Sequence, residues 1–334
     1  MTDTTSTSVA NHIASEVFAQ AALNPLRGRN NVLLQLLNMS NISGRGTKNR
    51  KIPKRTAIAA AVDDTEGVAF TNYAQLTYGT SITLTPTVKV QGVAVTSDAM
   101  ELVLPGVTKQ QAMALVRSGS PESIPLVAWA VEELYQSHLL RAETDALTLL
   151  SSISDSAASS GNTPTAAPAS FAMLLEGLFK IVENNTESED YVFVLEEQGV
   201  ADLRALAAGG TGAALSTLFT SGNQLDFFAH RPDVSKTGAR GGFAGIPIMS
   251  ANKSIMPTAN SAADRVAAII VAGRGETGAA GSVRGFAEFC ERYSPDIGFD
   301  YDLESDTLKA IARWATDVEI HTNEHACKLL YDVD

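Results

Sequence analysis

The stretch PESIPLVAWAVEELYQSHLLRAETDALTLLSSIS, residues 121–154, decides how this chain of 334 residues folds. Its apolar side chains recur every three or four positions, which is the repeat of a helix with one buried face. They are Ile124, Val127, Ala128, Val131, Leu134, Ala142, Ala146, Leu149 and Ile153. Pro121 and Pro125 suit only a first turn, which Ser120 or Ser123 can cap. About thirty residues at 1.5 Å each give a rod of roughly 45 Å, far above the mean helix length.

The opposite face of this rod is polar, so we expect it to lie at the surface. Its residues are Glu132, Glu133, Gln136, Arg141 and Glu143. His138 falls at the edge of the apolar stripe, where we expect a packing residue rather than a ligand.

Residues 68–100, VAFTNYAQLTYGTSITLTPTVKVQGVAVTSDAM, precede the rod and are rich in Thr, Val and Tyr. Gly79 and Pro86 interrupt this stretch and divide it into strand patterns that contain few apolar residues. The pattern predicts a long β-hairpin. Two strands with polar residues on both faces are not stable alone in water, so this hairpin must lie on a neighbour. The sequence thereby gives its first indication of a protein that works in an assembly.

Residues 151–170 follow the rod as a linker rich in Ser, Ala, Thr and Pro, and helix and strand patterns then alternate. The patterns predict helices at 171–182 and 200–208, buried strands at 191–195 and 266–272, and extended chain at 283–293 and 308–320. This succession belongs to the α+β class.

Acidic residues outnumber basic ones, 37 against 25, for a formal net charge of −12. Through residue 60, however, eight basic side chains are opposed only by Asp3 and Glu16, a net charge of +6. This arm is either an interaction tail, for nucleic acid or an acidic protein surface, or a solvated terminus. The acidic body excludes a protein that coats nucleic acid through general positive charge.

Two cysteines, Cys290 and Cys327, exclude a disulfide framework and a four-thiolate zinc site. The opening residues MTDTTSTSVA show no secretory signal pattern, and the longest apolar stretch, residues 266–272, is too short to cross a membrane. We therefore expect a soluble protein made inside the cell, without a membrane partner.

Gly273, Gly275 and Gly278 fit the pattern G-x-G-x-x-G after a buried strand, as in a dinucleotide-binding loop. No second strand–helix unit with a ribose-binding acid follows, so we expect a plain glycine-rich loop.

His321, Glu324 and His325 fit the zinc-peptidase pattern H-x-x-E-H, but the residues before them favour a strand. We expect a polar turn between the last two strands there.

Acidic residues alternate at Asp300, Asp302, Glu304 and Asp306. A calcium loop would need Gly at Ser305 and Glu at Ile311, so we expect a solvated acidic row on one face of an extended chain. The adjacent acids Glu196 and Glu197 are likewise expected at the surface. The sequence predicts no catalytic residue, metal site or cofactor.

The order of a basic arm, a long hairpin, a rod helix, an α/β part and closing strands resembles the major capsid proteins of tailed bacteriophages, the Hong Kong 97 type of fold. The resemblance covers roughly residues 52–330. It rests on DTEGVAFTNY and ITLTPTVKVQGVAVTSDAM for the extended loop, residues 121–154 for the spine helix, YVFVLEEQGVADLRALA and GGFAGIPIMSANKSI for the axial domain, and AIARWATDVEIHTNEHACKLL for the closing strands. It implies an N-terminal arm at 1–58, an extended loop (β-hairpin) at 59–105, the spine helix of the peripheral domain at 106–160, the axial domain at 161–284, and closing strands of the peripheral domain at 285–334.

The resemblance also implies a function. The chain is expected to be a major capsid protein that assembles as hexamers and pentamers into an icosahedral head around double-stranded DNA, located in the virion and assembled in the host cytoplasm. Implied partners are further copies of the chain, a separate scaffolding protein, a portal, a decoration protein, and packaged DNA contacted weakly and without sequence specificity. The predicted inter-subunit contact residues are Arg45, Arg50, Lys51, Lys54, Arg55, Tyr73, Tyr78 and Lys89.

Two alternatives remain at this point. An encapsulin-type nanocompartment shell shares the same fold, although the basic residues of the arm fit a viral arm better. An NAD-binding enzyme that uses Gly273, Gly275 and Gly278 is the alternative of another class.

Overall fold

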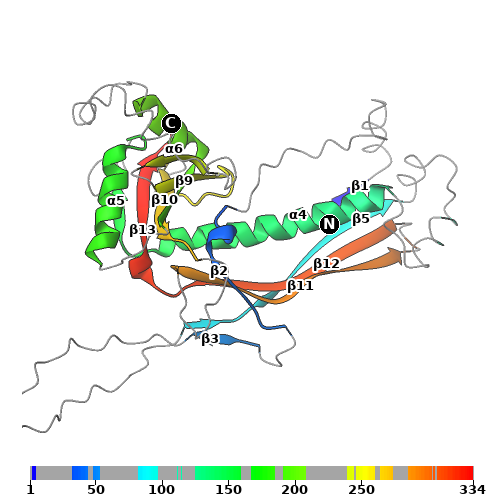
Figure 1. The fold of residues 1–334 in the computed structure, drawn as a ribbon. Helices are drawn as coiled ribbons and strands as arrows, with labels where there is room; N and C mark the ends of the chain where they lie inside the picture. The colour runs from blue at the N-terminus through cyan, green and yellow to red at the C-terminus, as the bar shows by residue number, and fades with distance from the viewer. Residues whose placement is uncertain are drawn as a thin grey trace, which may run out of the picture.

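The computed structural model describes residues 2–4, 32–43, 48–52, 82–96, 111, 114, 125–158, 167–184, 191–207, 239–243, 246–259, 264–273, 285–302, 304 and 307–333. Figure 1 shows an elongated molecule in which a rod helix lies along a five-stranded sheet and ends against a six-stranded sheet. A separate two-stranded sheet completes the described part.

Helix α4 (Pro125–Thr148) is the rod, and the short 3-10 helix η3 (Leu149–Ser152) continues it. Its 24 residues span about 36 Å at the helical rise of 1.5 Å per residue. The predicted stripe is buried at Val127, Leu134, Ala142, Ala146 and Ile153. Ala128 is exposed instead, so the buried face is narrower there than predicted.

The five-stranded sheet lies along α4 in the order β1-β5-β12-β11-β2. Its strands are β1 (Thr2–Thr4), β5 (Thr87–Thr96), β12 (Thr307–Ile320), β11 (Ala287–Asp302) and β2 (Asn38–Asn41). The His138 ring of α4 meets the Trp314 ring of β12 edge to face, with centroids 5.0 Å apart. His138 is therefore a packing residue, as predicted.

β11 and β12 form a long antiparallel ribbon whose register shifts twice between Glu291 and Asp296. β11 advances five residues over this stretch while β12 advances three, from Thr316 to Arg313. Pro295, which has no backbone N–H, lies inside this irregular stretch. A bulge is where a paired strand tolerates proline.

The six-stranded sheet has the order β6-β13-β10-β7-β9-β8. Its strands are β6 (Ser156–Ala158), β13 (Ala326–Asp332), β10 (Asp264–Val271), β7 (Tyr191–Glu196), β9 (Ile246–Ala251) and β8 (Ala239–Phe243). Helices α5 (Phe171–Glu183) and α6 (Glu197–Ala207) pack on it. The helices and buried strands predicted in this part of the sequence are thus confirmed, with boundaries shifted by a few residues.

The two-stranded sheet pairs β3 (Arg50–Ile52) with β4 (Ile82–Leu84) in antiparallel fashion. Ile52 lies opposite Ile82, so residues 53–81 connect two positions of the chain that are neighbours in this sheet. Of the predicted extended loop, residues 59–105, the structure describes residues 82–96, while residues 59–81 and 97–105 lie outside the described part.

Two predicted segment boundaries differ from the strand pairing. β5 falls within residues 59–105, assigned to the extended loop, yet it pairs with β12 along its whole length. β13 falls within residues 285–334, assigned to the peripheral domain with β11 and β12, yet it pairs with β10 in the other sheet. Both differences involve partners far apart in sequence, which local hydropathy does not specify.

The predicted N-terminal arm, residues 1–58, is also partly folded into the body. Leu33, Leu34 and Leu37, in and beside the short helix η1 (Leu34–Leu36), are buried in the main core. Three leucines within five positions remove enough apolar surface from water to hold this segment in place.

Candidate assembly surfaces

Within the described ranges, no helix is long and apolar enough to span a membrane. No group of three or more His, Cys, Asp or Glu side chains is arranged there to hold a metal ion. The motif H-x-x-E-H lies at the 3-10 turn η4 (Asn323–His325) between β12 and β13, which confirms the predicted polar turn.

The two histidines of this motif face different partners. The side-chain amide of Asn38 donates to His321 Nε2 over 3.3 Å, and His325 Nδ1 donates to the Gly285 carbonyl over 2.9 Å. Burial lowers the pKa of His321 to about 4, so its ring is neutral at pH 7. These histidines connect the turn to the arm and to the start of β11.

Gly273, the first glycine of the dinucleotide-like pattern, lies where the arm crosses the end of β10. Its N–H donates to the Leu36 carbonyl over 2.6 Å. A Cβ atom at Gly273 would lie 2.5 Å from Asn38 Oδ1 and 2.7 Å from Asn38 N. The close approach of two backbone segments explains this glycine, while Gly275 and Gly278 lie outside the described residues.

The alternating acids are exposed at Asp300 and Glu304, as predicted. Asp302 is half-buried and pairs with Lys309, Oδ2 to Nζ, over 2.6 Å. Asp306 lies outside the described residues.

Two acids predicted at the surface are buried, so that prediction was wrong. Glu143 is 0% exposed, and its two carboxylate oxygens accept the N–H groups of Leu33 and Leu34 over 2.7 and 2.9 Å. Desolvation raises the pKa of Glu143 to about 7, although the backbone donors act in the opposite direction. Glu196 is buried beside Arg265, with Oε2 2.5 Å from Nε. Both partners come from distant segments, which local polarity does not reveal.

Three of the eight predicted inter-subunit contact residues are described. The structure places Arg50 on β3 with Nε 2.6 Å from Oε1 of the fully buried Glu288, an ion pair within the subunit. A role of Arg50 between subunits stays a prediction. Lys51 is exposed on the same strand. Outside the described residues lie Arg45, Lys54, Arg55, Tyr73 and Tyr78.

The third described contact residue, Lys89, ties β5 to the rod. Its ammonium contacts Asp145 of α4 and donates to Thr316 Oγ1 over 3.1 Å. Arg141 Nε also pairs with Asp145, over 3.0 Å. A role of Lys89 between subunits stays a prediction.

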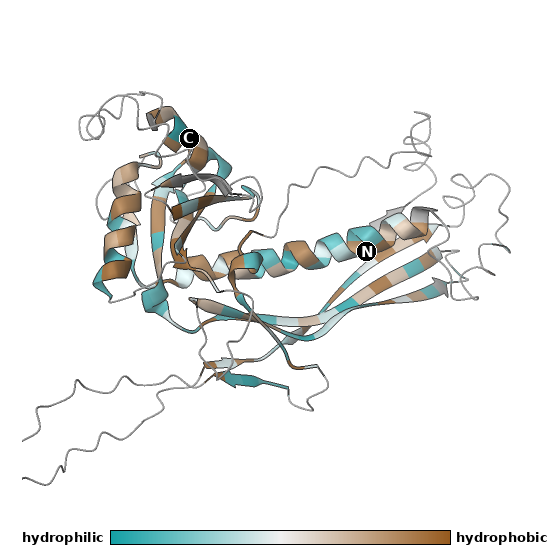
Figure 2. Cartoon of the chain, viewed as in Figure 1, coloured by the Kyte–Doolittle hydropathy of each residue, from teal (hydrophilic) through white to brown (hydrophobic). Residues whose placement is uncertain are grey.

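Exposed apolar patches on β5 and α5 were not identified from the sequence. Val88 and Val90 are each 57% exposed, on the face of β5 opposite Lys89. On α5, Phe179 and Val182 are 61% and 53% exposed, and the helix is brown over most of its length in Figure 2. The signal was present in FAMLLEGLFKIVE, which is apolar on both helical faces and therefore typical of a helix covered on both sides.

The outer edge of β5 is also incompletely paired. β1 pairs with it only at Val93, Ala94 and Val95. Along residues 87–92, no described strand pairs with this edge, since β12 lies on the other side. Such an edge presents backbone donors and acceptors to another chain.

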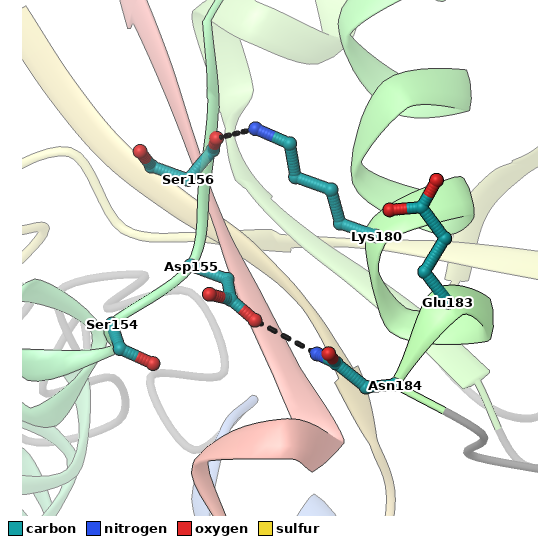
Figure 3. A pocket seen from close by; sticks show the side chains of 6 residues that line it. All are labelled: Ser154, Asp155, Ser156, Lys180, Glu183 and Asn184. Atoms are coloured by element: carbon teal, nitrogen blue, oxygen red, sulfur yellow. Dashed lines mark hydrogen bonds between the residues drawn. The ribbon is translucent and has the colours of Figure 1, made fainter.

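A polar hollow of about 320 Å³ lies beside the end of α5 (Figure 3). It is lined by Ser154, Asp155, Ser156, Lys180, Glu183 and Asn184. The Lys180 ammonium contacts the Ser156 carbonyl, and Asn184 Nδ2 donates to Asp155 Oδ2 over 2.8 Å. These side chains thus join the end of α5 to Asp155 and to the first residue of β6.

Comparison with known proteins identifies the architecture. No family model and no curated protein matches the chain. The capsid of a native GTA particle is 11% identical with a TM-score of 0.58, over 94% of each chain. The capsid of cyanophage P-SCSP1u is 12% identical with a TM-score of 0.55, over 95% of this chain and 92% of the other. An encapsulin complex from Synechococcus elongatus is 11% identical with a TM-score of 0.52, over 95% and 94%.

Such low identities establish the fold alone. The chain has the Hong Kong 97-like capsid fold, as its resemblance to this group predicted, with a mixed α+β architecture built on a long helix.

Proposed function

We propose that this chain is a structural shell protein and, more specifically, the major capsid protein of a tailed bacteriophage. Its copies would form hexamers and pentamers that close into an icosahedral head around double-stranded DNA. The observation that carries the proposal is the fold, which is shared with phage-type capsids over more than nine-tenths of the chain.

The described surface supports association between copies. A shell subunit must offer large contact areas to several neighbours at once. The edge of β5 along residues 87–92, which no described strand of this chain pairs with, can accept a strand from another copy, which would satisfy its backbone groups. The exposed side chains of Val88, Val90, Phe179 and Val182 would lose water on contact.

The charge distribution supports a container that holds DNA loosely. The net charge of −12 disfavours general attraction to phosphates, and Arg50 is already paired with Glu288 in its own subunit. We expect isolated assemblies to bind DNA weakly and without sequence preference at physiological salt.

The parts of the molecule receive roles under this proposal. α4 and the five-stranded sheet would form the peripheral domain, and the six-stranded sheet with α5 and α6 the axial domain. Residues 53–81 would reach neighbouring copies from the base formed by β3 and β4. Contacts between copies are proposed for Arg45, Arg50, Lys51, Lys54, Arg55, Tyr73, Tyr78 and Lys89. A scaffolding protein, a portal and a decoration protein would complete the virion head.

An encapsulin-type shell is the second candidate, favoured by the match to the Synechococcus encapsulin over 95% of this chain. Both candidates predict a closed shell without enzymatic turnover. They differ in content, because a nanocompartment encloses protein cargo and a phage head encloses DNA.

Expression of the full chain, followed by sedimentation and electron microscopy, tests the proposal. We expect rings or closed particles. A compact monomer that persists at high protein concentration would contradict a shell function. Mass spectrometry of the purified particles separates the two candidates, since a stoichiometric enclosed protein would favour the nanocompartment.

A further inference from the structure

The two-stranded sheet of β3 and β4 lies on the side of β11 and β12 that faces away from α4 (Figure 1). Lys51 and Thr83 are exposed on its outer face, whereas Ile52 and Leu84 are buried on its inner face. Two strands of this kind are not stable alone in water. The position of the small sheet therefore depends on the contacts that its inner face makes with the rest of the subunit.

The apolar part of this contact is small. Ile52 and Leu84 form a cluster with Ile42 and Cys290, and this cluster is separate from the main core. Because apolar attraction is non-directional, these four side chains hold the small sheet against the body without fixing its angle. The angle must come from polar contacts, which have a defined geometry.

Glu288 of β11 makes one such polar contact. Its side chain is 0% exposed, and Oε1 lies 2.6 Å from Arg50 Nε. Its neighbours on the adjoining strands are Asn38 of β2 and Glu319 of β12, which carry no positive charge. Neither carboxylate oxygen accepts a hydrogen bond from another described residue. Within the described ranges, the Arg50 guanidinium is therefore the group that compensates this buried charge.

A second polar contact lies on the neighbouring strand β12. Thr85, which directly follows β4, donates its N–H to Asp317 Oδ2 over 2.6 Å. Asp317 lies opposite Cys290, which is two residues beyond Glu288 on β11. A body attached at one point can turn about that point, whereas two attachments on different strands define its orientation. Arg50 and Thr85 together thus set the angle at which the small sheet meets the ribbon.

We propose that Arg50 and Glu288 are a positioning pair: their ion pair fixes the orientation of β3 and β4, and hence the direction in which the chain leaves the subunit after Ile52 and returns at Ile82. Without Arg50, displacement of β3 is the most direct way for Glu288 to regain water, because β2 and β12 flank it through backbone pairing. The pair acts within one subunit, while its consequence for contacts between copies rests on the shell function proposed above.

Electron paramagnetic resonance distance measurements on the full-length protein test this inference. Spin labels are placed at Lys51→Cys on β3 and Asp300→Cys on β11, which are exposed positions, whereas the native Cys290 and Cys327 are buried. Labelled chains are diluted with an excess of unlabelled protein, so that the distances measured are those within one subunit. We expect a narrow distance distribution with Arg50 intact and a distribution about twofold broader or more in Arg50→Met.

Matched variants separate the ion pair from other effects of substitution. Arg50→Lys keeps the charge and should keep the narrow distribution. Glu288→Met removes the same pair, so it should broaden the distribution, and Arg50→Met should then add nothing. Thr83→Ala, on the exposed face of the small sheet, should follow the wild type. Equal distributions in the wild type and Arg50→Met would overturn the positioning role, as would independent, additive effects of Arg50→Met and Glu288→Met.

Hydrogen exchange measured by mass spectrometry shows whether the change is local. In Arg50→Met, peptides covering residues 50–52 and 82–84 should lose protection by about 10- to 100-fold, because the unpaired Glu288 favours displacement of β3. Peptides covering β10 and β13 should keep the protection of the wild type. Equal losses in both sets would assign the effect to the whole subunit and overturn the inference.

Electron microscopy of the same variants tests the consequence for assembly. Closed particles from the wild type, with about a tenth as many or fewer from Arg50→Met, would support it. Equal numbers of particles despite a broader distance distribution would overturn the link between orientation and assembly. If the wild type itself forms no particles, the proposed shell function fails, and the distance measurement still decides the positioning role.

Discussion

The two large sheets bury their strands to very different degrees. Every residue of β10 is buried in the six-stranded sheet, and β7 and β13 pair with it on both sides. In the five-stranded sheet, β5 exposes Val88 and Val90, and one of its edges pairs with no described strand along residues 87–92. The central strand of the six-stranded sheet is enclosed by its own chain, whereas β5 of the five-stranded sheet has an edge and apolar side chains that another molecule can contact. Stability should therefore concentrate in the first sheet, and association in the second.

The largest expected effect lies in the core of the six-stranded sheet. Phe193 is fully buried on β7, and its ring packs edge-on against Phe243. Phe193→Ala should lower the free energy of unfolding by about 3–5 kcal/mol, because it removes apolar contacts and leaves a cavity. Denaturation in urea measures the change. Val90→Ala on β5 is the matched control and should change stability by less than about 0.5 kcal/mol. Similar losses in both variants would contradict the contrast between the sheets.

A pH effect is expected where the two sheets meet. Burial lowers the pKa of His321 to about 4 from an ordinary 6.5, so the unfolded chain binds this proton more readily. The contribution of neutral His321 is complete above pH 6.5 and is lost as the pH falls from 6.5 to 4, up to about 3 kcal/mol. His321→Gln should therefore show a flatter decline over this range in urea denaturation at a series of pH values. A decline equally steep in both proteins would rule out His321 as its source.

A smaller effect is expected where residues 36–38 cross the end of β10. Gly273→Ala places a methyl group against Asn38 and should cost about 1–3 kcal/mol of folding free energy. Gly298→Ala, on β11 in the other sheet, meets no atom within 4 Å and should change stability by less than about 0.5 kcal/mol. Thermal unfolding of the two variants makes the comparison. Equal melting temperatures would show that the chain around Asn38 adapts to the added methyl group.

The smallest expected change in subunit stability comes from residues 53–81. A two-residue Asn-Gly turn can join Ile52 to Ile82, which already lie opposite each other. The shortened subunit should keep its stability within about 1 kcal/mol, since loop length has a weak effect. Under the proposed function it should form no closed particles in electron microscopy. A Gly/Ser segment of the original length separates the effect of sequence from that of length, and closed particles from the shortened chain would remove this segment from assembly.

Local periodicity was sufficient to predict the elements that bury one face. The three-and-four spacing of the rod located α4, and the apolar run before Gly273 located β10. The polar turn at His321 to His325 was also recognisable, because it separates two apolar stretches.

Features that depend on distant partners were not predictable from local pattern. Glu143 and Glu196 look like surface acids in the sequence. Their burial is explained by contacts with the backbone of residues 33 and 34 and with Arg265, respectively. β13 follows β12 closely in sequence but pairs with β10, which no hydropathy pattern specifies. The eight predicted contact residues were chosen by charge and resemblance, and Arg50 shows that such a charge can serve the subunit itself.

The two register shifts in β11 have a geometric consequence. Between Glu291 and Asp296, β11 contains more residues than the part of β12 with which it pairs. The longer strand must bend to stay paired with the shorter one, so the two-stranded ribbon is curved there. Under the proposed function, copies that share such a bend and lie side by side would turn progressively away from a plane. The radius of the shell that they form would then be set in part by a few residues around Pro295 within each subunit.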